Sequence, residues 1–471
     1  MQPSSEELVI VVTGANGGVG FGICHRLLVQ LSSPCPSDAK PYFDVGRDLK
    51  RELDIPERAP DAGLTIVMAC RDAKRAQVAR EKLYRLLDEH ISKLTTATAY
   101  DSAVAFRRNV KLDIQKLDLS SVKSVLDFGK AISQKYEHIS HLIFNAGTAT
   151  YSHLDIPGFL YDLFTHPIHA VEHPRRNIQL NGVLSDDGLG FTWQCNVFGH
   201  YVLLTSPQYR SVQPLLVAHA HKTGSPARVL WMSSLDAEPT FDPKDDWQLT
   251  KTLHSYNASK FQIELICAEL EKRTREAAAG RAPSTMSELV APHGEVHHYV
   301  VSPGITSTNM SALLNIPIPG WRCLMLAAFF IVRFLGSPHV LMSLYSAAVA
   351  TVHLALVPLF AIPDPETAPH VTPADKAYPT WHVYHGKYTR AHPGRVLTLR
   401  FGAENDRWGR DRPGVIAVPV WEEHPDAGET LLERFERLYQ AFVAREGKGK
   451  RGERGGEEMV NGCGAGNGRA R

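Results

Sequence analysis

The sequence predicts an α/β fold in which a mainly parallel sheet carries helices on both faces. The first observation is the run LVIVVT at residues 8–13, which is apolar and largely β-branched, as a strand buried on both faces should be. The second is that similar runs alternate along the chain with charged, helix-periodic stretches. The expected strands lie at 8–13, 64–71, 110–119, 141–147, 227–234 and 297–304, and the expected helices at 18–31, 72–94, 120–136, 196–205, from about 255 onward, and 428–445.

The expected domain organisation is a single domain over residues 1–445 with three insertions. Residues 34–63 are rich in Pro and charge, residues 150–190 combine Pro, His and Gly with weak periodicity, and residues 236–254 form a long loop that can bulge outward. Residues 446–471 are glycine-rich and charged with almost nothing to bury, which predicts a disordered tail.

Charge and cysteine usage restrict the class of partner and compartment. The 51 Lys and Arg residues nearly cancel the 50 Asp and Glu residues, so charge does not favour nucleic acid as a partner. The 7 cysteines are an odd number without a CxxC pair, which indicates a reducing compartment. The polar start MQPSSEE predicts no signal peptide. The histidines at 153–173 are irregularly spaced, so no metal site is expected.

A glycine-rich turn, TGANGGVG at residues 13–20, joins the first expected strand to the first expected helix. Gly14 and Gly20 allow a tight turn and let a pyrophosphate approach the helix N-terminus without a Cβ in the way. Together with Asn16 and Val19 they are the expected contacts to a cofactor. The strand, the turn and the helix together predict a Rossmann-type, doubly wound sheet that binds a dinucleotide.

The end of the second strand indicates which dinucleotide binds. NAD-specific sites usually place Asp or Glu there to bind the ribose 2′-hydroxyl, whereas this strand ends MACRD and places Arg71 nearby. A guanidinium matches a 2′-phosphate in charge and in its forked donors, which predicts NADP(H). The alternative is that Arg71 is a surface charge and Asp72 binds the hydroxyls.

Tyr256 and Lys260 stand four residues apart in YNASK, at the start of an expected helix, and therefore share one face. Carbonyl reduction needs a proton delivered to oxygen as hydride reaches carbon, and a phenol with its ordinary pKa of about 10 is poorly matched to neutral pH. A nearby cation lowers that pKa. We therefore expect Tyr256 to be the acid and Lys260 to tune it, although an isolated YxxxK is more often a solvated helix face.

In this order along the chain, TGxxxGxG, NAG, the strand ending WMSS and YxxxK resemble the short-chain dehydrogenase/reductase family. The resemblance implies further site residues, each with a role. They are Asp118 near the adenine, Asn145 at the sheet centre and lining the cofactor, Asn196 anchoring a water linked to Lys260, Ser234 polarising the substrate oxygen (with Ser233 as the alternative), Ile305 packing on the nicotinamide, and Thr308 reaching its carboxamide or the pyrophosphate.

The segment from Leu163 to Tyr201 is similar to the corresponding segment of the fungal 3-keto-steroid reductases of ergosterol synthesis, as are FLGSPH at 334–339 and DDW at 245–247. This resemblance implies NADPH-dependent reduction of the 3-ketone left during sterol C4-demethylation, giving the 3β-hydroxysterol. It also implies other C4-demethylation enzymes and a sterol cyclase as partners, a homodimer, and a place on the cytosolic face of the endoplasmic reticulum membrane and on lipid droplets.

The most apolar segment, residues 321–362, bears on contact with a membrane. Val340–Ile362 approaches the ~20 apolar residues that a spanning helix needs, but Pro358 and two flanking or internal histidines interrupt the segment. A core helix with an interfacial apolar flap is therefore favoured over a span.

Two alternative functions remain open from the sequence. One is reduction of another lipophilic carbonyl, such as a retinoid or a polyketide-like ketone, because ACR after the second strand also occurs in retinol-type members of the family. Those members lack the 150–190 insertion in this form. The other is a docking protein that stabilises another sterol enzyme, against which the intact Ser234, Tyr256 and Lys260 argue.

Overall fold

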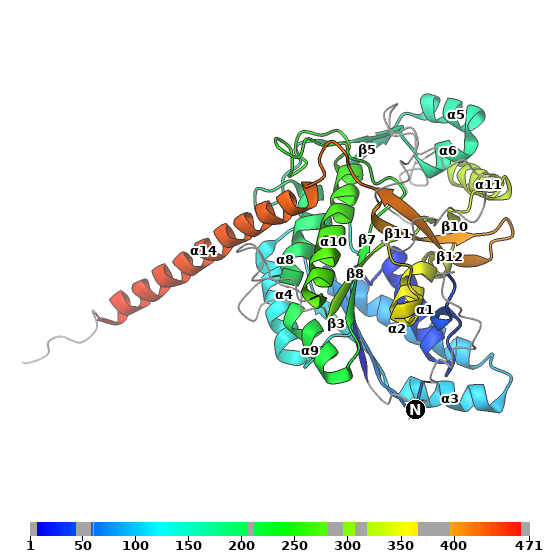
Figure 1. Cartoon of the computed structure of the whole chain (residues 1–471), viewed down its shortest axis with the longest axis horizontal. Helices are drawn as coiled ribbons and strands as arrows, with labels where there is room; N and C mark the ends of the chain where they lie inside the picture. The colour runs from blue at the N-terminus through cyan, green and yellow to red at the C-terminus, as the bar shows by residue number, and fades with distance from the viewer. Residues whose placement is uncertain are drawn as a thin grey trace, which may run out of the picture.

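The computed structural model of the chain describes residues 7–43, 58–59, 61–205, 212–279, 295–306, 318–365 and 396–462, which include one large sheet (Figure 1). Its eight strands are ordered β12-β11-β8-β7-β4-β1-β2-β3. Every neighbouring pair is parallel except β11 and β12, which are antiparallel. The strands are β1 (Leu8–Thr13), β2 (Leu64–Cys70), β3 (Val110–Lys116), β4 (His141–Phe144), β7 (Ala227–Met232), β8 (Val296–Ser302), β11 (Val396–Asn405) and β12 (Asp411–Pro419).

The strand order confirms the predicted Rossmann-type fold. From β3 to β8 the sheet reads third, second, first, fourth, fifth and sixth strand in chain order, which is the order of the doubly wound dinucleotide-binding fold. β1 is the centre of this arrangement, because Leu8 pairs with Leu64 of β2 on one side and Ile10 pairs with His141 of β4 on the other. The connections therefore turn in opposite directions on the two sides of β1.

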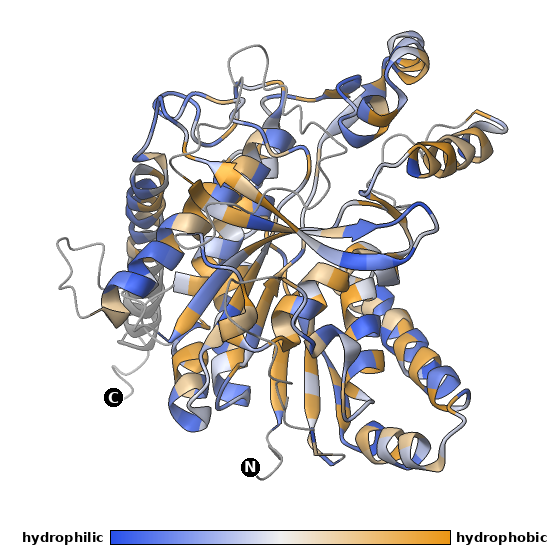
Figure 2. Ribbon diagram, turned by 45° about the vertical axis from the view of Figure 1, so that its right-hand side comes forward, coloured by the Kyte–Doolittle hydropathy of each residue, from blue (hydrophilic) through white to orange (hydrophobic). Residues whose placement is uncertain are grey.

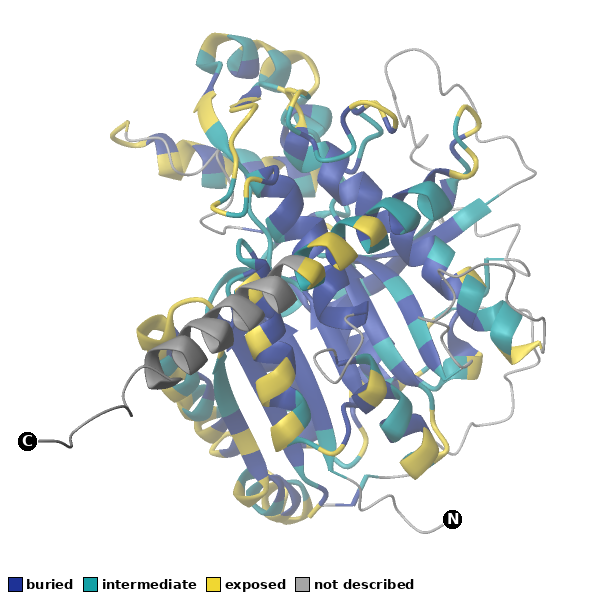
Figure 3. Cartoon of the chain, turned by 90° about the vertical axis from the view of Figure 1, so that its left-hand side faces the viewer, coloured by how far each residue is buried: buried dark blue, intermediate teal, exposed yellow. Residues whose placement is uncertain are grey.

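Helices cover both faces of the sheet, and most residues of the central strands are buried (Figure 3). β1 shows the alternation directly: Val9 and Val11 belong to the core on one face, and Ile10 and Val12 to the core on the other. On the Ile10 side lie α1 (Gly18–Leu31), α2 (Ala73–Ile91), α3 (Ala97–Arg108) and α13 (Val349–Leu356); on the Val9 side lie α4 (Val122–Lys135), α8 (Gly199–Thr205), α9 (Gln213–Thr223), α10 (Ser255–Ala278) and the first part of α14 (Ala427–Gly462).

The 150–190 insertion folds into a small unit of its own elements. It contains the antiparallel ribbon β5 (Tyr151–Leu154) and β6 (Asn177–Gln179), with α5 (Ile156–Thr165) and α6 (Pro167–Glu172) between the two strands. Phe159 and Val171 share a buried cluster with Met325 and Phe329 of α11 (Trp321–Phe334). We call the 150–190 insertion and α11 together the cap, and Figure 1 shows α5, α6 and α11 side by side.

The remaining elements are short. They are η1 (Ser37–Ala39) in the first insertion, α7 (Phe191–Trp193) and the π-helical turn η2 (Gln194–Phe198) before α8, the parallel pair β9 (Ile305–Thr306) and β10 (Val340–Met342), α12 (Leu344–Ala347) and η5 (Leu359–Ala361).

β11 and β12 were not among the strands expected from the sequence. β11 carries a charged and a glycine residue, Arg400 and Gly402, and β12 carries Gly414, all of which weaken a strand pattern. Their partners decide the conformation: Arg400 pairs with Val300 of β8 on one side and with Ile416 of β12 on the other.

The apolar segment 321–362 is divided among several elements. α11, β10, α12, α13 and η5 follow one another within it, and α13 is a buried core helix, as favoured from the sequence. Pro358 follows shortly after the end of α13, consistent with the bias of the residue before proline away from helix. Across the described ranges, no helix combines the length and the apolar content needed to cross a bilayer.

The C-terminal segment differs from the expected disorder over part of its length. α14 continues to Gly462, so residues 446–462 are helical, while 463–471 lie outside the described residues. The first part of α14 packs on the core through Leu431, Phe435 and Tyr439. Extending an existing helix is far easier than nucleating a new one, so a weak helix former can continue from a packed start.

Candidate active site

The expected cofactor and catalytic residues gather at one edge of the main sheet. Parallel strands end at the same edge, and Gly14, Arg71, Asn145 and Ser234 follow the ends of β1, β2, β4 and β7. This edge lies where the connections diverge on the two sides of β1. Open α/β sheets bind their ligands in the crevice at such a switch point.

The glycine-rich turn packs closely against the end of β4. Gly14 has φ +70°, a left-handed conformation that glycine adopts without strain. A Cβ on Gly20 would lie 2.5 Å from both Asn145 Nδ2 and Gly14 O. The turn leads into the N-terminus of α1, where the N-cap residue Gly17 offers no side chain as a cap. The backbone N–H groups there can donate hydrogen bonds to an anion at close range.

Asn16 and Val19 lie on this same turn. The backbone N–H groups of Ala15 and Asn16 donate to the Cys70 thiol, and this lowers the thiol's pKa, although burial is the larger effect and raises the pKa to about 11. Val19 is partly buried against the core. The turn is therefore attached to the end of β2 as well as to β4.

Asn145 joins the ends of β1 and β4. Its Nδ2 donates to Thr13 O at 2.9 Å, and its backbone N–H donates to Thr13 Oγ1 at 3.0 Å. Thr13 Oγ1 also lies 3.1 Å from His200 Nε2. Burial lowers the pKa of His200 to about 3, so its ring is neutral. Asn145 therefore connects the ends of β1 and β4.

Arg71 and Asp118 have opposite electrostatic effects on the Cys195 thiol. Burial raises the pKa of this thiol to about 12, the Asp118 carboxylate raises it further, and the exposed Arg71 opposes the rise. Asp118 accepts hydrogen bonds from the backbone and hydroxyl of Ser120 at 3.0 and 2.7 Å. The pair can therefore serve one end of a dinucleotide.

Asp72, the alternative to Arg71, serves as a helix cap. Its carboxylate accepts the Arg75 backbone N–H at 3.0 Å and caps the N-terminus of α2. This contact engages one oxygen of the carboxylate, whereas Arg71 is exposed at the end of β2.

Tyr256 and Lys260 lie together at the start of α10. Lys260 Nζ is 5.7 Å from the centroid of the Tyr256 ring and donates to Met232 O at 2.7 Å. Burial raises the pKa of Tyr256 to about 12, although a hydrogen bond with Ser234 opposes the rise. Burial also lowers the pKa of Lys260 to about 8.

The direction of the Tyr256 shift differs from the sequence expectation that Lys260 lowers this pKa. Burial of the phenol is the largest influence on its pKa and raises it, the Asp236 carboxylate raises it further, and the Lys260 ammonium is directed at Met232 O. At neutral pH, Tyr256 therefore holds its proton and Lys260 remains mainly charged.

The two serines after β7 face different partners. The Ser234 hydroxyl hydrogen-bonds to Tyr256. Ser233 is buried, and its Oγ donates to Glu264 Oε1 at 2.6 Å. Ser234 therefore lies beside Tyr256, whereas the hydroxyl of the alternative, Ser233, is hydrogen-bonded to Glu264.

A buried ion pair supports this serine turn from behind. Arg400 of β11 donates to Glu264 Oε1 at 3.0 Å and to Ser234 O at 2.7 Å. The two side chains are 6% and 1% exposed. Sequence reasoning missed both residues, although an acid within the apolar run FQIELICAEL was a signal that could have found Glu264.

Asn196 lies in the π-helical turn η2, between β4 and α10. Its Nδ2 donates to Thr148 O and to Ser259 Oγ, both at 2.9 Å, and its Oδ1 accepts the Thr148 N–H at 2.7 Å. A Cβ on Gly147 would lie 3.3 Å from Asn196 Oδ1 and 3.5 Å from Lys260 Nζ, so these groups are neighbours. π-helical turns are frequent at functional sites.

Part of the 236–254 loop packs inward, whereas the sequence had suggested that the loop could bulge outward. Phe241 and Leu249 are buried in the main core. The buried Asp246 carboxylate accepts backbone N–H groups from Thr250, Lys251 and Thr252 at 2.7 to 2.9 Å. Because the loop's backbone groups are satisfied internally, it can be buried without leaving polar groups unpaired.

The cap contributes several groups around Tyr256. The ring centroid of Tyr151 on β5 lies 6.2 Å from that of Tyr256. His173, at the end of α6, has its Nδ1 3.4 Å from Asp236 Oδ1, in the loop after Ser234. These residues were not among the sequence-predicted site residues, because the insertion carries no recognisable motif.

The segment after β8 holds only part of the expected site. Gly304 has φ +66°, and a Cβ there would lie 2.5 Å from Leu341 Cδ2 and 2.8 Å from His339 O. Ile305 follows in β9, and its backbone N–H donates to His339 O at 2.7 Å. Thr308 lies outside the described residues. Within the described parts, no group of three or more His, Cys, Asp or Glu side chains could hold a metal ion.

Comparison with known proteins finds relatives that cover most of the chain. It is 27% identical over 447 residues to the 3-keto-steroid reductase of Aspergillus fumigatus, covering 91% of this chain and 85% of the relative. The 3-keto-steroid reductase of Schizosaccharomyces pombe is 25% identical over 433 residues, with 92% and 96% covered. That of Saccharomyces cerevisiae is 28% identical over 348 residues, with 74% and 80% covered. These relatives confirm the resemblance inferred from the sequence motifs.

Among solved structures, the chain is similar to a Pseudomonas aeruginosa RhlG/NADP active-site complex, at 17% identity and a TM-score of 0.39, covering 75% of this chain and 92% of that one. No family model matches the chain. The fold assignment rests on the observed strand order.

Proposed function

We propose that the chain is an NADPH-dependent reductase that converts a 3-keto sterol to the 3β-hydroxysterol during sterol C4-demethylation. The observation that carries the proposal is the similarity to three fungal 3-keto-steroid reductases over most of the chain. It is supported by the placement of Ser234, Tyr256 and Lys260 beside the crevice of a Rossmann-type sheet.

The crevice residues fit a dinucleotide with a 2′-phosphate. Glycine at position 20 lets the turn pack closely against Asn145 and the Gly14 backbone, and the N-terminus of α1 lies at this turn. The exposed Arg71 guanidinium would hold the 2′-phosphate, and Asp118 would lie near the adenine. When bound, NADPH would supply hydride to the carbonyl carbon.

The chain's own residues supply the proton and orient the ketone. Ser234 donates a hydrogen bond to the carbonyl oxygen, and Tyr256, protonated at neutral pH, delivers its proton to that oxygen. The Lys260 ammonium, 5.7 Å from the phenol ring centroid, stabilises the phenolate that remains. The buried Glu264–Arg400 pair holds the Ser234 backbone while this occurs.

The test is NADPH oxidation with a 3-keto sterol such as zymosterone in detergent, beside NADH and retinal. We expect sterol-dependent turnover with NADPH. Tyr256→Phe should lower kcat about 100- to 10,000-fold, the usual contribution of a general acid, while NADPH still binds. Tyr100→Phe, at an exposed tyrosine of α3, is the matched control and should leave kcat unchanged.

The other outcomes separate the alternatives. Turnover with retinal alone would support the assigned catalytic residues and rule out a sterol as the substrate. No turnover with any ketone, together with stabilisation of a second sterol enzyme that survives Tyr256→Phe, would favour the docking role.

The surface of α11 supports peripheral association with a membrane, which a sterol reductase needs to reach its substrate. Its outward side chains Leu324, Phe330, Ile331, Phe334 and Leu335 are exposed, and α11 is mostly hydrophobic at the edge of the molecule (Figure 2). Trp408, 78% exposed at the β11–β12 turn, packs edge-on to Phe334. We call these six residues the α11 face.

Basic side chains accompany the α11 face. Arg322, Arg407 and Arg410 are exposed, and Arg333 lies over the Phe330 ring at 4.9 Å. The one acid of the turn, Asp406, accepts the backbone N–H groups of the turn itself. Apolar side chains flanked by arginines fit the headgroup region of an anionic bilayer. We place this contact on the cytosolic face of the endoplasmic reticulum and on lipid droplets.

Vesicle flotation tests the α11 face. With phosphatidylserine-containing vesicles, we expect binding that weakens with salt and is lost in Phe330→Ser/Ile331→Ser/Phe334→Ser. Val78→Ser/Tyr100→Ser removes exposed apolar groups of α2 and α3 and should bind like wild type. Equal binding of both variants would show that the α11 face is not the membrane-binding surface.

Size-exclusion light scattering would test the expected homodimer. Co-purification with other C4-demethylation enzymes or a sterol cyclase would test the expected partners.

A further inference from the structure

The catalytic helix α10 has no cap from its own sequence at its N-terminus. His254 is the N-cap residue and makes no side-chain cap hydrogen bond, and Tyr256 is the second residue of the helix. The first backbone N–H groups of any helix have no acceptor within the helix. At this helix the uncapped N–H groups include that of the residue proposed to deliver the proton, so their partner bears on catalysis.

A side chain of the 150–190 insertion, Gln179, supplies the missing acceptor at the N-terminus of α10. Gln179 Oε1 accepts the Tyr256 backbone N–H at 2.9 Å and the Ser255 hydroxyl at 3.4 Å. Its Nε2 donates to Asn257 Oδ1 at 2.9 Å. A backbone N–H can only donate, so the contact with Tyr256 fixes which amide atom is oxygen. A single side chain, 7% exposed, thus holds three consecutive residues centred on Tyr256.

The ribbon that carries Gln179 also places a ring beside Tyr256. Gln179 on β6 pairs with Tyr151 on β5, and opposite residues of an antiparallel pair share one face. Gln179 holds the backbone of Tyr256 while the Tyr151 ring lies 6.2 Å from its ring. This cross-strand pair therefore faces the catalytic residue as a unit.

The ribbon is itself firmly attached within the insertion. Leu180 N donates to Thr150 O at 2.8 Å, and Thr150 Oγ1 donates to Leu180 O at 3.0 Å. Arg176, just before β6, forms ion pairs with Asp155 at 3.4 Å and Asp162 at 2.8 Å. These contacts limit the freedom of Gln179 and make it suitable for holding another group in place.

We propose that Gln179 is a positioning residue for Tyr256, so that the reductase site is complete only when the 150–190 insertion is folded against α10. The inference deepens the proposed reductase function and rests on it. Gln179 acts on the reacting phenol through the backbone of Tyr256. Its loss should therefore lower kcat and leave the KM for the ketone and the Kd for NADPH nearly unchanged.

The first test compares Gln179→Met with Gln262→Met. Gln262 is a second buried amide on α10; its Oε1 accepts Trp193 Nε1–H and its Nε2 donates to Trp247 O, both at 2.9 Å, away from residues 255–257. We expect Gln179→Met to lower kcat about 10- to 100-fold, the scale on which small misplacements of reacting groups act. Gln262→Met should lower the melting temperature without this loss of kcat. An equal loss in both variants, or none in Gln179→Met, overturns the proposal.

Two further variants separate positioning from folding. Gln179→Glu keeps an acceptor for the Tyr256 N–H, and a helix N-terminus favours the negative charge of that acceptor. The Asn257 amide can rotate to donate to it. This variant should therefore retain most of the wild-type kcat. Should Gln179→Met not fold, Asn257→Ala removes only the second contact and should lower kcat about 2- to 10-fold. An unchanged kcat in Asn257→Ala would then count against the proposal.

A measurement independent of turnover keeps the two proposals distinguishable. Amide hydrogen exchange at Tyr256 should accelerate in Gln179→Met and not in Gln262→Met, because only the former loses the acceptor. Unchanged exchange at Tyr256 overturns the role of Gln179 whether or not the wild type turns over any ketone. Absence of turnover in wild type, with accelerated exchange in the variant, counts against the reductase function alone.

Discussion

The titration of Lys260 should set the upper pH limit of ketone reduction. Burial lowers its pKa to about 8, while the pKa of Tyr256 is raised to about 12. The phenol therefore stays protonated across the ordinary range, and the first group to change charge as pH rises is the lysine. A neutral lysine no longer stabilises the phenolate left after proton transfer.

We expect kcat/KM for reduction to be level below pH about 7 and to fall as pH rises through about 8, because kcat/KM reports the free enzyme's essential groups. A pH–rate profile with the ketone measures this. In Lys260→Arg, whose guanidinium stays charged, the residual activity should lose this decline. A wild-type profile level beyond pH about 9 would contradict the assignment.

Glu264 and Arg400 show how a buried charge pair can support an active site from behind. Removing one partner leaves the other charge buried without compensation. Arg400→Met should therefore lower the free energy of unfolding by about 3–5 kcal/mol, measured by urea denaturation. Replacing both, as in Arg400→Met/Glu264→Leu, should recover much of the loss. A double variant as unstable as the single one would show that the pair's charge is not the cause.

At the scale of elements, the end of α6 joins the cap to two other segments. Glu172 accepts the Ser337 hydroxyl at 2.6 Å, which ties α6 to the loop after α11. His173 pairs with Asp236 in the loop after Ser234. The insertion is therefore attached to the catalytic loop through a titratable group.

Burial and the neighbouring carboxylates have opposite effects on the pKa of His173. Burial disfavours the charged ring, but the hydrogen bond to Asp236 and the charges of Asp236, Glu172 and Glu238 outweigh it and raise the pKa of His173. His169, whose ring centroid lies 5.3 Å away, has its pKa lowered to about 4 and is neutral. A raised pKa stabilises the fold fully below the unfolded-state value and less as pH rises through the folded-state value.

His173→Gln should therefore lower the free energy of unfolding most near pH about 6, with the difference from wild type shrinking toward pH about 9. Denaturation at several pH values measures it. The exposed His153 of the same insertion provides the control, His153→Gln, which should show no such trend. A deficit that grows with pH would contradict the ion pair.

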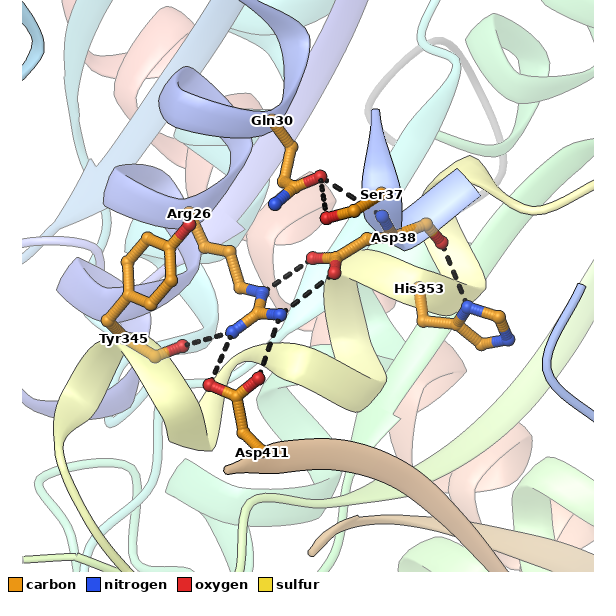
Figure 4. Close-up of polar contacts among 7 residues, drawn as sticks. All are labelled: Arg26, Gln30, Ser37, Asp38, Tyr345, His353 and Asp411. Carbon is orange, nitrogen blue, oxygen red and sulfur yellow. Dashed lines mark hydrogen bonds and ion pairs between the residues drawn. The ribbon is translucent and has the colours of Figure 1, made fainter. Parts of the chain in front are cut away.

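At the scale of the whole molecule, Arg26 joins four segments that are distant in sequence (Figure 4). Its guanidinium donates to Asp38 in the first insertion at 2.5 and 2.8 Å, to Asp411 of β12 at 3.0 Å and to Tyr345 O of α12 at 3.2 Å. Gln30 Oε1 accepts the Asp38 backbone N–H at 3.0 Å beside it. The added edge strand and the first insertion are thereby fixed to α1.

Arg26→Met should destabilise the protein by about 3–5 kcal/mol, because two carboxylates lose their shared cation. Arg26→Lys should lose less, since it keeps the charge without the bidentate geometry. Thermal and urea denaturation measure both. Equal stability of Arg26→Met and wild type would mean that these segments are held by apolar packing alone.

Six of the eight strands of the main sheet, six of the helices and the candidate catalytic residues could be predicted from the sequence alone. Period-two and period-3.6 patterns are local, and the glycine-rich turn and YNASK carry their chemistry within a few residues. These features could therefore be recognised from the sequence without knowledge of any tertiary contact.

The surroundings of Tyr256 and the direction of its pKa shift depend on tertiary packing. Gln179 reaches Ser255 and Tyr256 from 76 or more positions away, and Arg400 reaches Ser234 from 166 positions away on a strand without a clear pattern, so no spacing rule relates them. The pKa of Tyr256 rises, where the sequence favoured a fall, because burial is its largest cause and is a property of the packed molecule.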